Sequence, residues 1–355
     1  MANLLDPNIS WRSDAIPVSN RFDDPYYSAE NGLAETRHVF LAGNDLPDRW
    51  RDRARFTIGE LGFGTGLNFL ATWKAWRDSG QTGRLSFVSV EGYPLDADSV
   101  RRASAAFPEV SELAKTLIDR LPLRRPGHHL LHFDDGLVTL LLVYDEVASA
   151  LDDVALLADA WYLDGFAPVR NPAMWAPDIL SRVAARSASD ATVATFTSAG
   201  TVRRGLVEAG FTMEKRPGFG SKRECLTGQL NARAPRRFQA ALNGADAPLS
   251  GVKGGPVVII GAGIAGMSAA RALGDAGAEV MVCDRYGMAG GGASGTPAGL
   301  LQPRPLNDGS PLAAFFHAAF EFAARTYDAL DDVWISRGVL VLGRDAADGA
   351  RYQAL

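Results

Sequence analysis

The sequence predicts an α/β protein that consists of one Rossmann-like domain and the beginning of a second. Strand-like and helix-like segments alternate regularly between residues 56 and 230, which favours a parallel sheet covered by helices on both faces. Glycine-rich turns of the nucleotide-binding kind begin at Gly62 and again at Gly261. Residues 232–255 are rich in Ala, Gly, Pro, Asn and Asp without apolar periodicity, which is typical of a linker. We therefore expect domains at residues 1–231 and 256–355.

The composition excludes several classes of protein. A chain of 355 residues suggests about two domains, and its net charge of −5 argues against a protein that coats nucleic acid, although a local basic surface is compatible with it. Cys225 and Cys283 form no CxxC pair, which disfavours a metal or disulfide framework and suits a reducing cytoplasm. Neither a signal peptide nor an uncharged apolar run of roughly 18 residues is visible, so we expect no membrane segment.

The first fifty-odd residues look irregular. The stretch Phe-Asp-Asp-Pro-Tyr-Tyr-Ser at residues 22–28 mixes aromatic residues with turn formers. Such a segment either packs on the sheet edge or folds over a bound ligand, and the sequence favours neither.

An alternate-glycine turn follows the first strand of the sheet. Glu60 stands near the end of that strand, and Gly62, Gly64 and Gly66 precede an amphipathic helix at residues 67–76. Without a Cβ, glycine lets the main chain pass close to a ligand, and the free N–H groups of a helix start favour polar or anionic groups. The spacing GxGxG after an acidic strand end is typical of S-adenosylmethionine binding in class I methyltransferases. A glycine-rich turn without a ligand is the alternative.

The other elements of the first domain complete this plan. We expect strands at residues 56–61, 85–91, 129–133, 160–163 and 191–196, a further strand or hairpin at 138–144, and helices at 96–107, 113–121, 171–186 and 202–209. Strands at 211–216 and 224–230 read as a closing antiparallel hairpin. Five βα units and such a hairpin are the class I methyltransferase arrangement.

Acidic residues end successive strands of this predicted sheet. Glu91 ends the second strand, and Asp134 and Asp135 follow the third. Because ligands of open α/β sheets bind outside the carboxyl ends of the strands, these acids and Glu60 would share one site. Glu91 suits the two ribose hydroxyls, and Asp134 or Asp135 suits the adenine amino group. Each of them alone could simply cap a helix.

Asp164, which follows the fourth strand, is the strongest candidate for chemistry. Methyl transfer is an in-line displacement in which positioning supplies much of the acceleration. An amine acceptor is mostly protonated near neutral pH, since a Lys-like amine has a pKa of about 10.4. A carboxyl group that hydrogen-bonds the amine and accepts its proton meets this need. The alternative is a cap for the following helix, from which Pro168 and Arg170 separate Asp164.

Four stretches resemble one particular methyltransferase family. They are Asn-Gly-Leu-Ala-Glu-Thr-Arg-His-Val-Phe at residues 31–40, Glu-Leu-Gly-Phe-Gly-Thr-Gly-Leu-Asn-Phe-Leu at 60–70, Asp-Gly-Phe-Ala-Pro-Val-Arg-Asn-Pro-Ala-Met-Trp at 164–175 and Gly-Phe-Gly-Ser-Lys-Arg-Glu-Cys-Leu-Thr at 218–227. The family makes 5-methylaminomethyl-2-thiouridine at the wobble position of tRNA, and the likeness extends over residues 17–230. It implies methyl transfer from S-adenosylmethionine to the primary amine of 5-aminomethyl-2-thiouridine. By the same resemblance, Asp164 is the acceptor-side acid, and Phe166 and Pro168 shape the base pocket.

A tRNA substrate requires a basic surface. Residues 201–240 contain nine Lys or Arg against three Glu, in a chain that is acidic as a whole. Among them we expect Arg203, Lys222 and Arg223 to contact tRNA, since phosphate contacts supply affinity. Runs of this kind are also common on ordinary solvated surfaces.

The second glycine-rich turn matches GxGxxG at Gly261, Gly263 and Gly266, and the next strand ends at Asp284. This is the dinucleotide-binding fingerprint, with Asp284 placed for a ribose, and FAD and NAD share it. Residues 290–299, which include Ser294, resemble the segment that passes near the flavin in glycine- and amino-acid-oxidase-like flavoproteins, which favours FAD. In the tRNA-modifying family, such a half removes the carboxymethyl group from the wobble carboxymethylaminomethyl group. We expect residues 256–355 to be an incomplete flavin domain of a truncated chain that methylates without oxidising.

Two alternatives remain open from the sequence. One is a methyltransferase of the same fold that acts on a small-molecule amine, and the other is a nucleotide-binding scaffold without catalysis. The sequence predicts neither the set of tRNAs used nor the oligomeric state.

Overall fold

The computed structural model describes residues 6–12, 16–28, 31–231, 255–275, 277–302, 310–328, 330, 332–338 and 344–353. The chain forms two compact units, one ending at residue 248 and the other beginning at residue 249. Apart from Gly255, the expected linker at residues 232–255 lies outside the described residues, so its limits stay a prediction.

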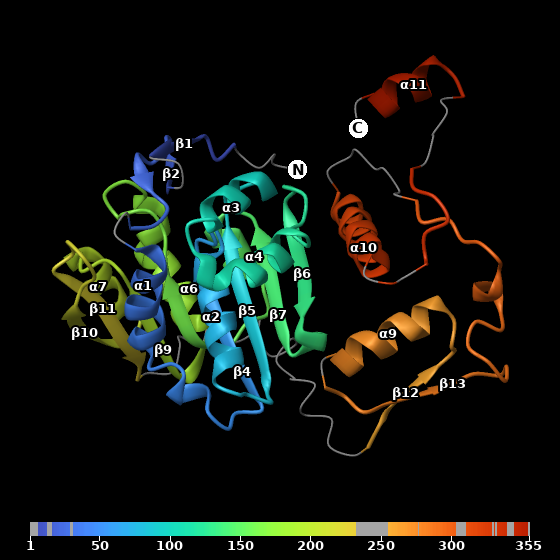
Figure 1. The fold of residues 1–355 in the computed structure, drawn as a ribbon, viewed down its shortest axis with the longest axis horizontal. Coiled ribbons are helices and arrows are strands. Elements are labelled where there is room, and N and C mark those ends of the chain that lie inside the picture. The colour runs from blue at the N-terminus through green and yellow to red at the C-terminus, as the bar shows by residue number, and fades with distance from the viewer. Residues whose placement is uncertain are drawn as a thin grey trace. The chain divides into compact units, whose positions relative to one another are not determined.

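An eight-stranded sheet forms the centre of the first unit (Figure 1). In chain order its strands are β4 (Arg55–Leu61), β5 (Arg84–Glu91), β6 (Gly127–Phe133), β7 (Val138–Tyr144), β8 (Ala158–Leu163), β9 (Ser187–Thr195), β10 (Phe211–Pro217) and β11 (Glu224–Leu230). Their order in the sheet is β10-β11-β9-β8-β4-β5-β7-β6. The five central strands are parallel, whereas β6, β10 and β11 each pair antiparallel with their neighbours. The predicted parallel sheet and closing hairpin are confirmed.

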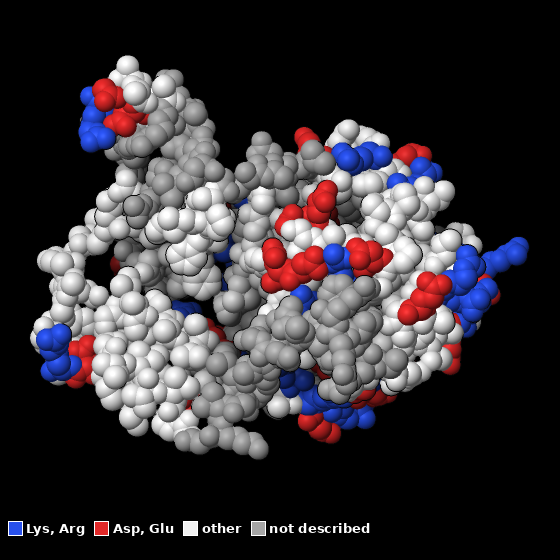
Figure 2. All heavy atoms as spheres, turned by 180° about the vertical axis from the view of Figure 1, so that it is seen from behind, with Lys and Arg blue, Asp and Glu red and all other residues white. Residues whose placement is uncertain are grey.

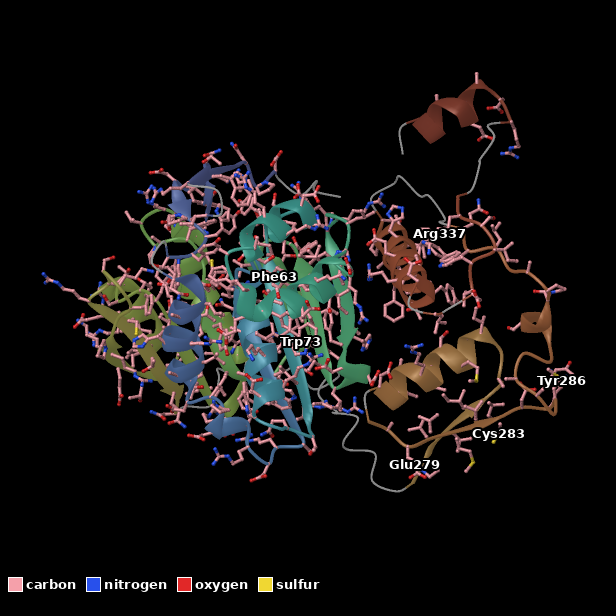
Figure 3. All side chains as sticks on the ribbon, viewed as in Figure 1. Phe63, Trp73, Glu279, Cys283, Tyr286 and Arg337 are labelled. Carbon is pink, nitrogen blue, oxygen red and sulfur yellow. The ribbon has the colours of Figure 1, made fainter. Side chains whose placement is uncertain are left out.

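Helices cover both faces of this sheet. They are α1 (Gly32–Thr36), α2 (Leu67–Asp78), α3 (Ala97–Ser104), α4 (Ser111–Ile118), α5 (Val147–Asp153), α6 (Pro177–Ala185) and α7 (Gly200–Glu208). Side chains alternate across β8, so that Tyr162 packs into the core under α1, α2 and α4, while Trp161 and Leu163 pack into the core under α5, α6 and α7. Such alternation is what buries both faces of a strand. Phe63 and Trp73, labelled in Figure 3, belong to the first of these cores.

Two predicted helices differ from the expected segments. The helix expected at residues 171–186 begins as a short 3₁₀ turn at Pro172–Trp175 and restarts as α6 at Pro177, because a proline ring cannot continue the preceding turn. The helix expected at residues 96–107 ends earlier, at Ser104. Asp96 caps the start of this helix, since the backbone N–H of Ser99 donates to Oδ1 of Asp96 at 2.7 Å.

The third parallel strand is β7 and not the segment at residues 129–133. That segment belongs to β6, which is an antiparallel edge strand joined to β7 by a tight turn. Asp134, Asp135 and Gly136 form this turn with positive φ angles of 50°, 52° and 83°. Because β6 runs antiparallel to the others, its carboxyl end lies at the amino ends of the parallel strands.

The N-terminal aromatic segment belongs to a small separate sheet. The strands β1 (Ile9–Arg12), β2 (Ile16–Ser19) and β3 (Asp24–Pro25) pair in that order. Residues 22–28 include β3, and the aromatic side chains of Phe22 and Tyr26 on either side of it pack over the site described below.

The second unit contains a βαβ arrangement. The strands β12 (Val257–Ile260) and β13 (Val280–Cys283) are parallel, and α9 (Ile264–Asp275) connects them. The helices α10 (Pro311–Asp328) and α11 (Ala346–Gln353) follow. The second glycine motif therefore lies between a parallel strand and a helix.

Candidate active site

The candidate site begins at the glycine turn between β4 and α2. Gly62, Gly64 and Gly66 have φ angles of 92°, 53° and 77°, which favour glycine. A Cβ on Gly62 would lie 1.9 Å from the carbonyl oxygen of Asp164, so this turn lies directly against the residue that follows β8. No side-chain hydrogen bond caps the start of α2, which leaves backbone N–H groups for a ligand.

Asn68, in the first turn of α2, joins two of the predicted acids. Its Nδ2 donates to Oε1 of Glu60 at 2.9 Å and to Oδ2 of Asp164 at 2.6 Å. Its Oδ1 accepts a hydrogen bond of 2.8 Å from the hydroxyl of Thr36 on α1. Every polar atom of this buried amide is therefore used, and the Asp164 carboxyl is held in one orientation.

Glu60 lies beneath the turn. Its side chain is wholly buried, and its other oxygen accepts a hydrogen bond of 2.5 Å from the hydroxyl of Ser89. Burial raises the pKa of Glu60 to about 8, against the opposing effect of these hydrogen bonds. The carboxyl is thus at the predicted strand end, but it contacts Asn68 and Ser89 instead of an open surface.

Asp164 has an unusual pKa for an aspartate. It keeps some exposed surface, yet desolvation raises its pKa to about 7. The bond from Asn68 lowers the pKa, as does the charge of Lys222, while Glu35 and Asp24 raise it. A carboxyl group with a pKa near neutrality is suited to exchange protons in catalysis.

Glu91 ends β5 beside the same turn. Its Oε2 accepts a hydrogen bond of 2.9 Å from the N–H of Gly64, and its Oε1 accepts one of 2.7 Å from the N–H of Tyr93. Burial raises the pKa of this carboxyl, and the backbone hydrogen bonds oppose that effect. The structure therefore brings Glu60, Glu91 and Asp164 together, as predicted.

Aromatic residues of the N-terminal segment pack against the loop after Asp164. Phe22 stacks on Phe166 with ring centroids 4.7 Å apart, and Tyr26 meets Phe166 edge-on at 5.2 Å. A hydrogen bond joins the two segments, since the backbone N–H of Ala167 donates to Oδ2 of Asp24 at 2.8 Å. The aromatic segment thus packs over a loop of the site, and its folding over a bound ligand stays a prediction. Pro168 lies in the same loop.

The hydroxyl of Tyr26 is a buried group without a hydrogen-bond partner. The ring lies over the glycine turn, because a Cβ on Gly64 would be 3.1 Å from Cδ1 of Tyr26. An orphaned hydroxyl beside glycine N–H groups and a carboxylate is what a bound polar ligand would satisfy.

The prediction that Asp134 or Asp135 contacts adenine is wrong. Both lie in the β6–β7 turn, at the amino ends of the parallel strands and away from Glu91. Asp134 forms an ion pair with Arg77 and accepts a hydrogen bond of 2.7 Å from Nε1 of Trp73, so its role is to fasten the end of α2.

Asp145 is the acid that follows the third parallel strand. It comes directly after β7, and its backbone oxygen would lie 3.7 Å from a Cβ on Gly92, the residue after Glu91. The sequence contains a signal for this residue, since an acid follows the apolar run at residues 138–144, but the segment before Asp134 has a strand pattern as well.

The basic residues of the hairpin region separate into two groups. Lys222 is paired with Glu35 at 2.8 Å, whereas Arg203 on α7 and Arg223 in the β10–β11 turn are exposed. Lysine and arginine side chains lie beside acidic ones on the face of the molecule shown in Figure 2. Three further arginines of the predicted basic stretch, at positions 233, 236 and 237, lie outside the described residues.

In the second unit the GxGxxG turn has the geometry of its motif. A Cβ on Gly266 would lie 1.9 Å from the carbonyl oxygen of Gly261, so only glycine allows this close packing. Oδ2 of Asp284 accepts a hydrogen bond of 2.6 Å from the N–H of Ala262 within the turn. Oγ of Ser294 accepts one of 3.0 Å from the N–H of Ile264 at the start of α9 and lies 3.1 Å from the Cβ position of Gly263.

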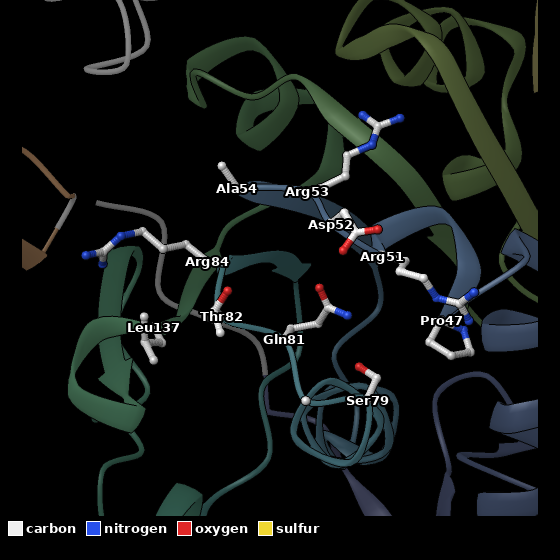
Figure 4. A pocket seen from close by; sticks show the side chains of 12 residues that line it. Pro47, Arg51, Asp52, Arg53, Ala54, Ser79, Gln81, Thr82, Arg84 and Leu137 are labelled. Atoms are coloured by element: carbon white, nitrogen blue, oxygen red, sulfur yellow. The ribbon is translucent and has the colours of Figure 1, made fainter.

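A cavity of about 840 Å³ lies elsewhere, at the amino ends of β4 and β5 (Figure 4). Three arginines line it, but Arg51 pairs with Asp48 at 2.6 Å, Arg53 pairs with Asp190 at 3.1 Å, and Arg84 donates to the carbonyl of Gly136 at 3.0 Å. Ligands of this fold bind at the opposite ends of the strands. The cavity therefore does not belong to the candidate site.

Comparisons with known proteins agree with this geometry. Residues 108–231 match a family described as S-adenosyl-L-methionine-dependent methyltransferase, and residues 256–355 match one described as FAD dependent oxidoreductase. The tRNA 5-methylaminomethyl-2-thiouridine biosynthesis bifunctional protein MnmC of Maricaulis maris is 46% identical over 325 residues, or 91% of this chain and 54% of that protein. Its counterpart in Thiobacillus denitrificans is 41% identical over 356 residues, or 99% of this chain and 56% of that protein. The chain is homologous to these bifunctional proteins.

The chain spans about half the length of the MnmC relatives that it matches. The crystal structure of MNMC2 from Aquifex aeolicus has the same fold, with a TM-score of 0.52 at 21% identity, and the match covers 66% of this chain and 75% of that one. A methyltransferase domain followed by an FAD-dependent oxidoreductase domain, which the sequence predicted, is thereby confirmed.

Three residues of the site were not predicted from the sequence. Asn68 and Glu35 stand within stretches that resemble the MnmC family, but only the tertiary structure brings them to Asp164. Asp145 could be recognised only once the strand order was known.

Among the described residues, every helix is too short or too polar to span a bilayer, and no group of three or more metal-binding side chains is found.

Proposed function

We propose that the first unit methylates the primary amine of 5-aminomethyl-2-thiouridine at the tRNA wobble position, with S-adenosylmethionine as methyl donor. The observation that carries this proposal is the Asp164 carboxyl, which Asn68 holds at 2.6 Å beside the glycine turn and whose pKa is raised to about 7. The homology to the MnmC proteins supports the choice of substrate. A cytoplasmic location and tRNA as partner follow from that choice.

The residues around the glycine turn fit S-adenosylmethionine. Gly62, Gly64 and Gly66 would let the backbone approach it, Glu91 would accept from the ribose hydroxyls, and the orphaned Tyr26 hydroxyl supplies a further polar contact. We assign the adenine side to Asp145 in place of Asp134 and Asp135. Glu60 acts through its hydrogen bond to Asn68 and not by direct contact, because its carboxyl is wholly buried.

S-adenosylmethionine supplies a methyl group and an electron sink, since its sulfur takes the electron pair of the broken C–S bond. The acceptor nitrogen must present a lone pair for the new N–C bond and must lose one proton. Asp164 would hydrogen-bond the amine, orient its lone pair and accept that proton. Phe166 and Pro168 would border the uracil ring, and Arg203 and Arg223 would contact phosphates.

For the second unit we propose FAD binding. Gly261, Gly263 and Gly266 leave room for the pyrophosphate at the start of α9, where backbone N–H groups favour anions. Asp284, at the end of β13, would accept from the ribose, as in other dinucleotide folds. Ser294 lies at the same helix start and would contact the phosphate. In the whole protein, we propose that this half converts carboxymethylaminomethyluridine to aminomethyluridine.

The experiment that tests the methyltransferase proposal uses labelled S-adenosylmethionine and tRNA from cells that lack this enzyme. Nucleoside analysis should show the label in 5-methylaminomethyl-2-thiouridine and none in tRNA that is already modified. Labelling of free small amines, with tRNA left unlabelled, would contradict the tRNA proposal in favour of a small-molecule methyltransferase. Binding of S-adenosylmethionine without transfer to either class would indicate a scaffold.

A further inference from the structure

An ion pair beside Asp164 joins two segments that are far apart in the sequence. Nζ of Lys222, in the β10–β11 turn, lies 2.8 Å from Oε1 of Glu35 on α1. The Glu35 side chain is only 10% exposed and that of Lys222 is 44% exposed. The backbone N–H of Ser28 donates to Oε2 of Glu35 at 3.2 Å, and the Lys222 ammonium lies 4.2 Å from the centroid of the Phe196 ring. The ammonium is thus held between a carboxylate and an aromatic face.

The two charges of this pair shift the pKa of Asp164 in opposite directions. Glu35 raises the pKa of Asp164, and Lys222 lowers it. Asp24 on β3 is a second acid that raises it. Lys222 also lowers the pKa of the Cys225 thiol on β11, which burial raises.

The neighbouring groups complete the electrostatic surroundings of the pair. His38, just after α1, is another titratable residue that contacts the hairpin. Its Nε2 lies 2.8 Å from the carbonyl oxygen of Pro217. The helix α1 also contacts the site through Thr36, the residue next to Glu35, whose hydroxyl donates to Asn68. One short helix therefore positions both Asp164 and Lys222.

Three acids around one amine would be harmful to methylation. Asp164, Glu35 and Asp24 together would favour the charged ammonium form, which has no lone pair to attack with. A fixed cation among them has the opposite effect, since like charges in a partly buried site lower the pKa of an amine.

We propose that Lys222 is a positioning residue that keeps the acceptor amine of the tRNA unprotonated, and that Glu35 holds Lys222 in that place. The inference rests on the proposed methyltransferase function. As part of a basic stretch, Lys222 was expected to contact a tRNA phosphate. The role proposed here is different: its charge acts on the amine, which must lose its proton before the lone pair can form the N–C bond.

The two members of the pair should shift the pH profile in opposite directions. Lys222→Met removes a positive charge and should move the acid limb of kcat upward by about one pH unit, so that kcat at pH 7 falls about tenfold. Glu35→Gln keeps the shape and the hydrogen bonds but removes a negative charge, and should move the limb downward. Lys222→Arg should restore most of the wild-type profile.

The full 355-residue chain is assayed with tRNA from cells lacking the enzyme, and calorimetry measures S-adenosylmethionine binding. The matched control is Lys215→Met, because Lys215 pairs with Glu224 at 2.7 Å on the same hairpin. It should leave the limb unmoved, and donor affinity should be unchanged in all four variants.

A raised KM for tRNA with an unmoved limb in Lys222→Met would overturn the inference and indicate a phosphate contact. The same holds if Glu35→Gln and Lys222→Met move the limb in the same direction. These results leave methylation by the wild-type chain intact. A wild-type chain that binds the donor but methylates no tRNA would overturn the proposed function itself and this inference with it.

Discussion

At the scale of single residues, the site depends on carboxyl groups whose pKa values are displaced by burial. Glu60 and Asp164 both bind protons more tightly than free carboxyls, and Asn68 connects them. The hydrogen bonds of Asn68 lower both pKa values, but desolvation outweighs them. Residue identity alone would have assigned ordinary acidic pKa values to both.

Asp164→Asn should lower the methylation rate by about 10²–10⁴, the usual contribution of one acid–base group. The amide cannot accept a proton, whereas donor affinity should change little. Since the pKa of Asp164 is about 7, protonation of this carboxyl should add to protonation of the amine in slowing wild-type methylation below pH 7, and only the contribution of the carboxyl should be lost in Asp164→Asn. Single-turnover rates between pH 5.5 and 9 measure both effects, with Asp48→Asn, whose side chain is 77% exposed, as control. Wild-type turnover by Asp164→Asn would contradict the assignment.

Glu60→Gln should make the protein more stable relative to wild type as the pH rises. The folded-state pKa of Glu60 is about 8, above the unfolded value, so the folded state binds the extra proton between roughly pH 4.5 and 8. Stability from this group is therefore present at low pH and is lost as the pH rises through that window. Glutamine can keep the bonds to Asn68 and Ser89 without ionising. Thermal unfolding at pH 5 and pH 8 tests this, and an identical difference from wild type at both values would refute it.

At the scale of elements, turns and strand ends decide which side chains meet. The glycine turn lies against the loop after β8, and α1 links the hairpin to the start of α2. These contacts join segments more than 90 residues apart, such as Asn68 and Asp164.

Gly62→Ala should destabilise the protein more than Gly80→Ala. Both glycines have positive φ, 92° and 66°, so alanine is strained at either position. Only at Gly62 does the new Cβ meet an atom, the Asp164 carbonyl oxygen at 1.9 Å, whereas nothing lies within 4 Å at Gly80. We expect a further loss of about 1–3 kcal/mol in the free energy of unfolding at Gly62, the usual cost of overpacking. Urea denaturation of both variants gives the difference, and equal losses would show that the backbone moves freely.

Asp145→Asn should weaken S-adenosylmethionine binding, while Asp134→Asn should leave it unchanged. Asp145 follows a parallel strand and lies at the ligand end of the sheet, but Asp134 follows an antiparallel one. Asp134→Asn should instead lower the melting temperature, because it weakens the contacts with Arg77 and Trp73. Calorimetric titration and thermal unfolding of both variants separate the two roles. The reverse pattern would restore the original assignment of Asp134.

At the scale of the whole molecule, the chain consists of two compact units. They match two different families, and the two matched regions are separated by the predicted linker. Each unit contains its own glycine-rich turn at the start of a helix. The first has the eight-stranded sheet, the buried cores and the residues on which the methyltransferase proposal rests.

Limited proteolysis should cut first within residues 232–255. This stretch lacks the apolar periodicity that would bury its backbone, and exposed polar segments are the preferred sites of nicking. The fragment that ends near Asn231 should retain S-adenosylmethionine binding, as measured by calorimetry. A folded fragment without that binding would place the domain boundary elsewhere.

The sequence by itself determined the α/β class, the two glycine turns and the acids at the ends of β4, β5 and β8. Those features depend on local patterns, because a strand, a tight turn and a helix start are specified by neighbouring residues. The tertiary structure decided which strand is the third parallel one, since periodicity cannot distinguish parallel from antiparallel pairing. It also decided the surroundings of Asp164. Asn68 donates to this carboxyl, and Glu35 and Lys222 shift its pKa, only when the sheet, α1 and the closing hairpin have packed together.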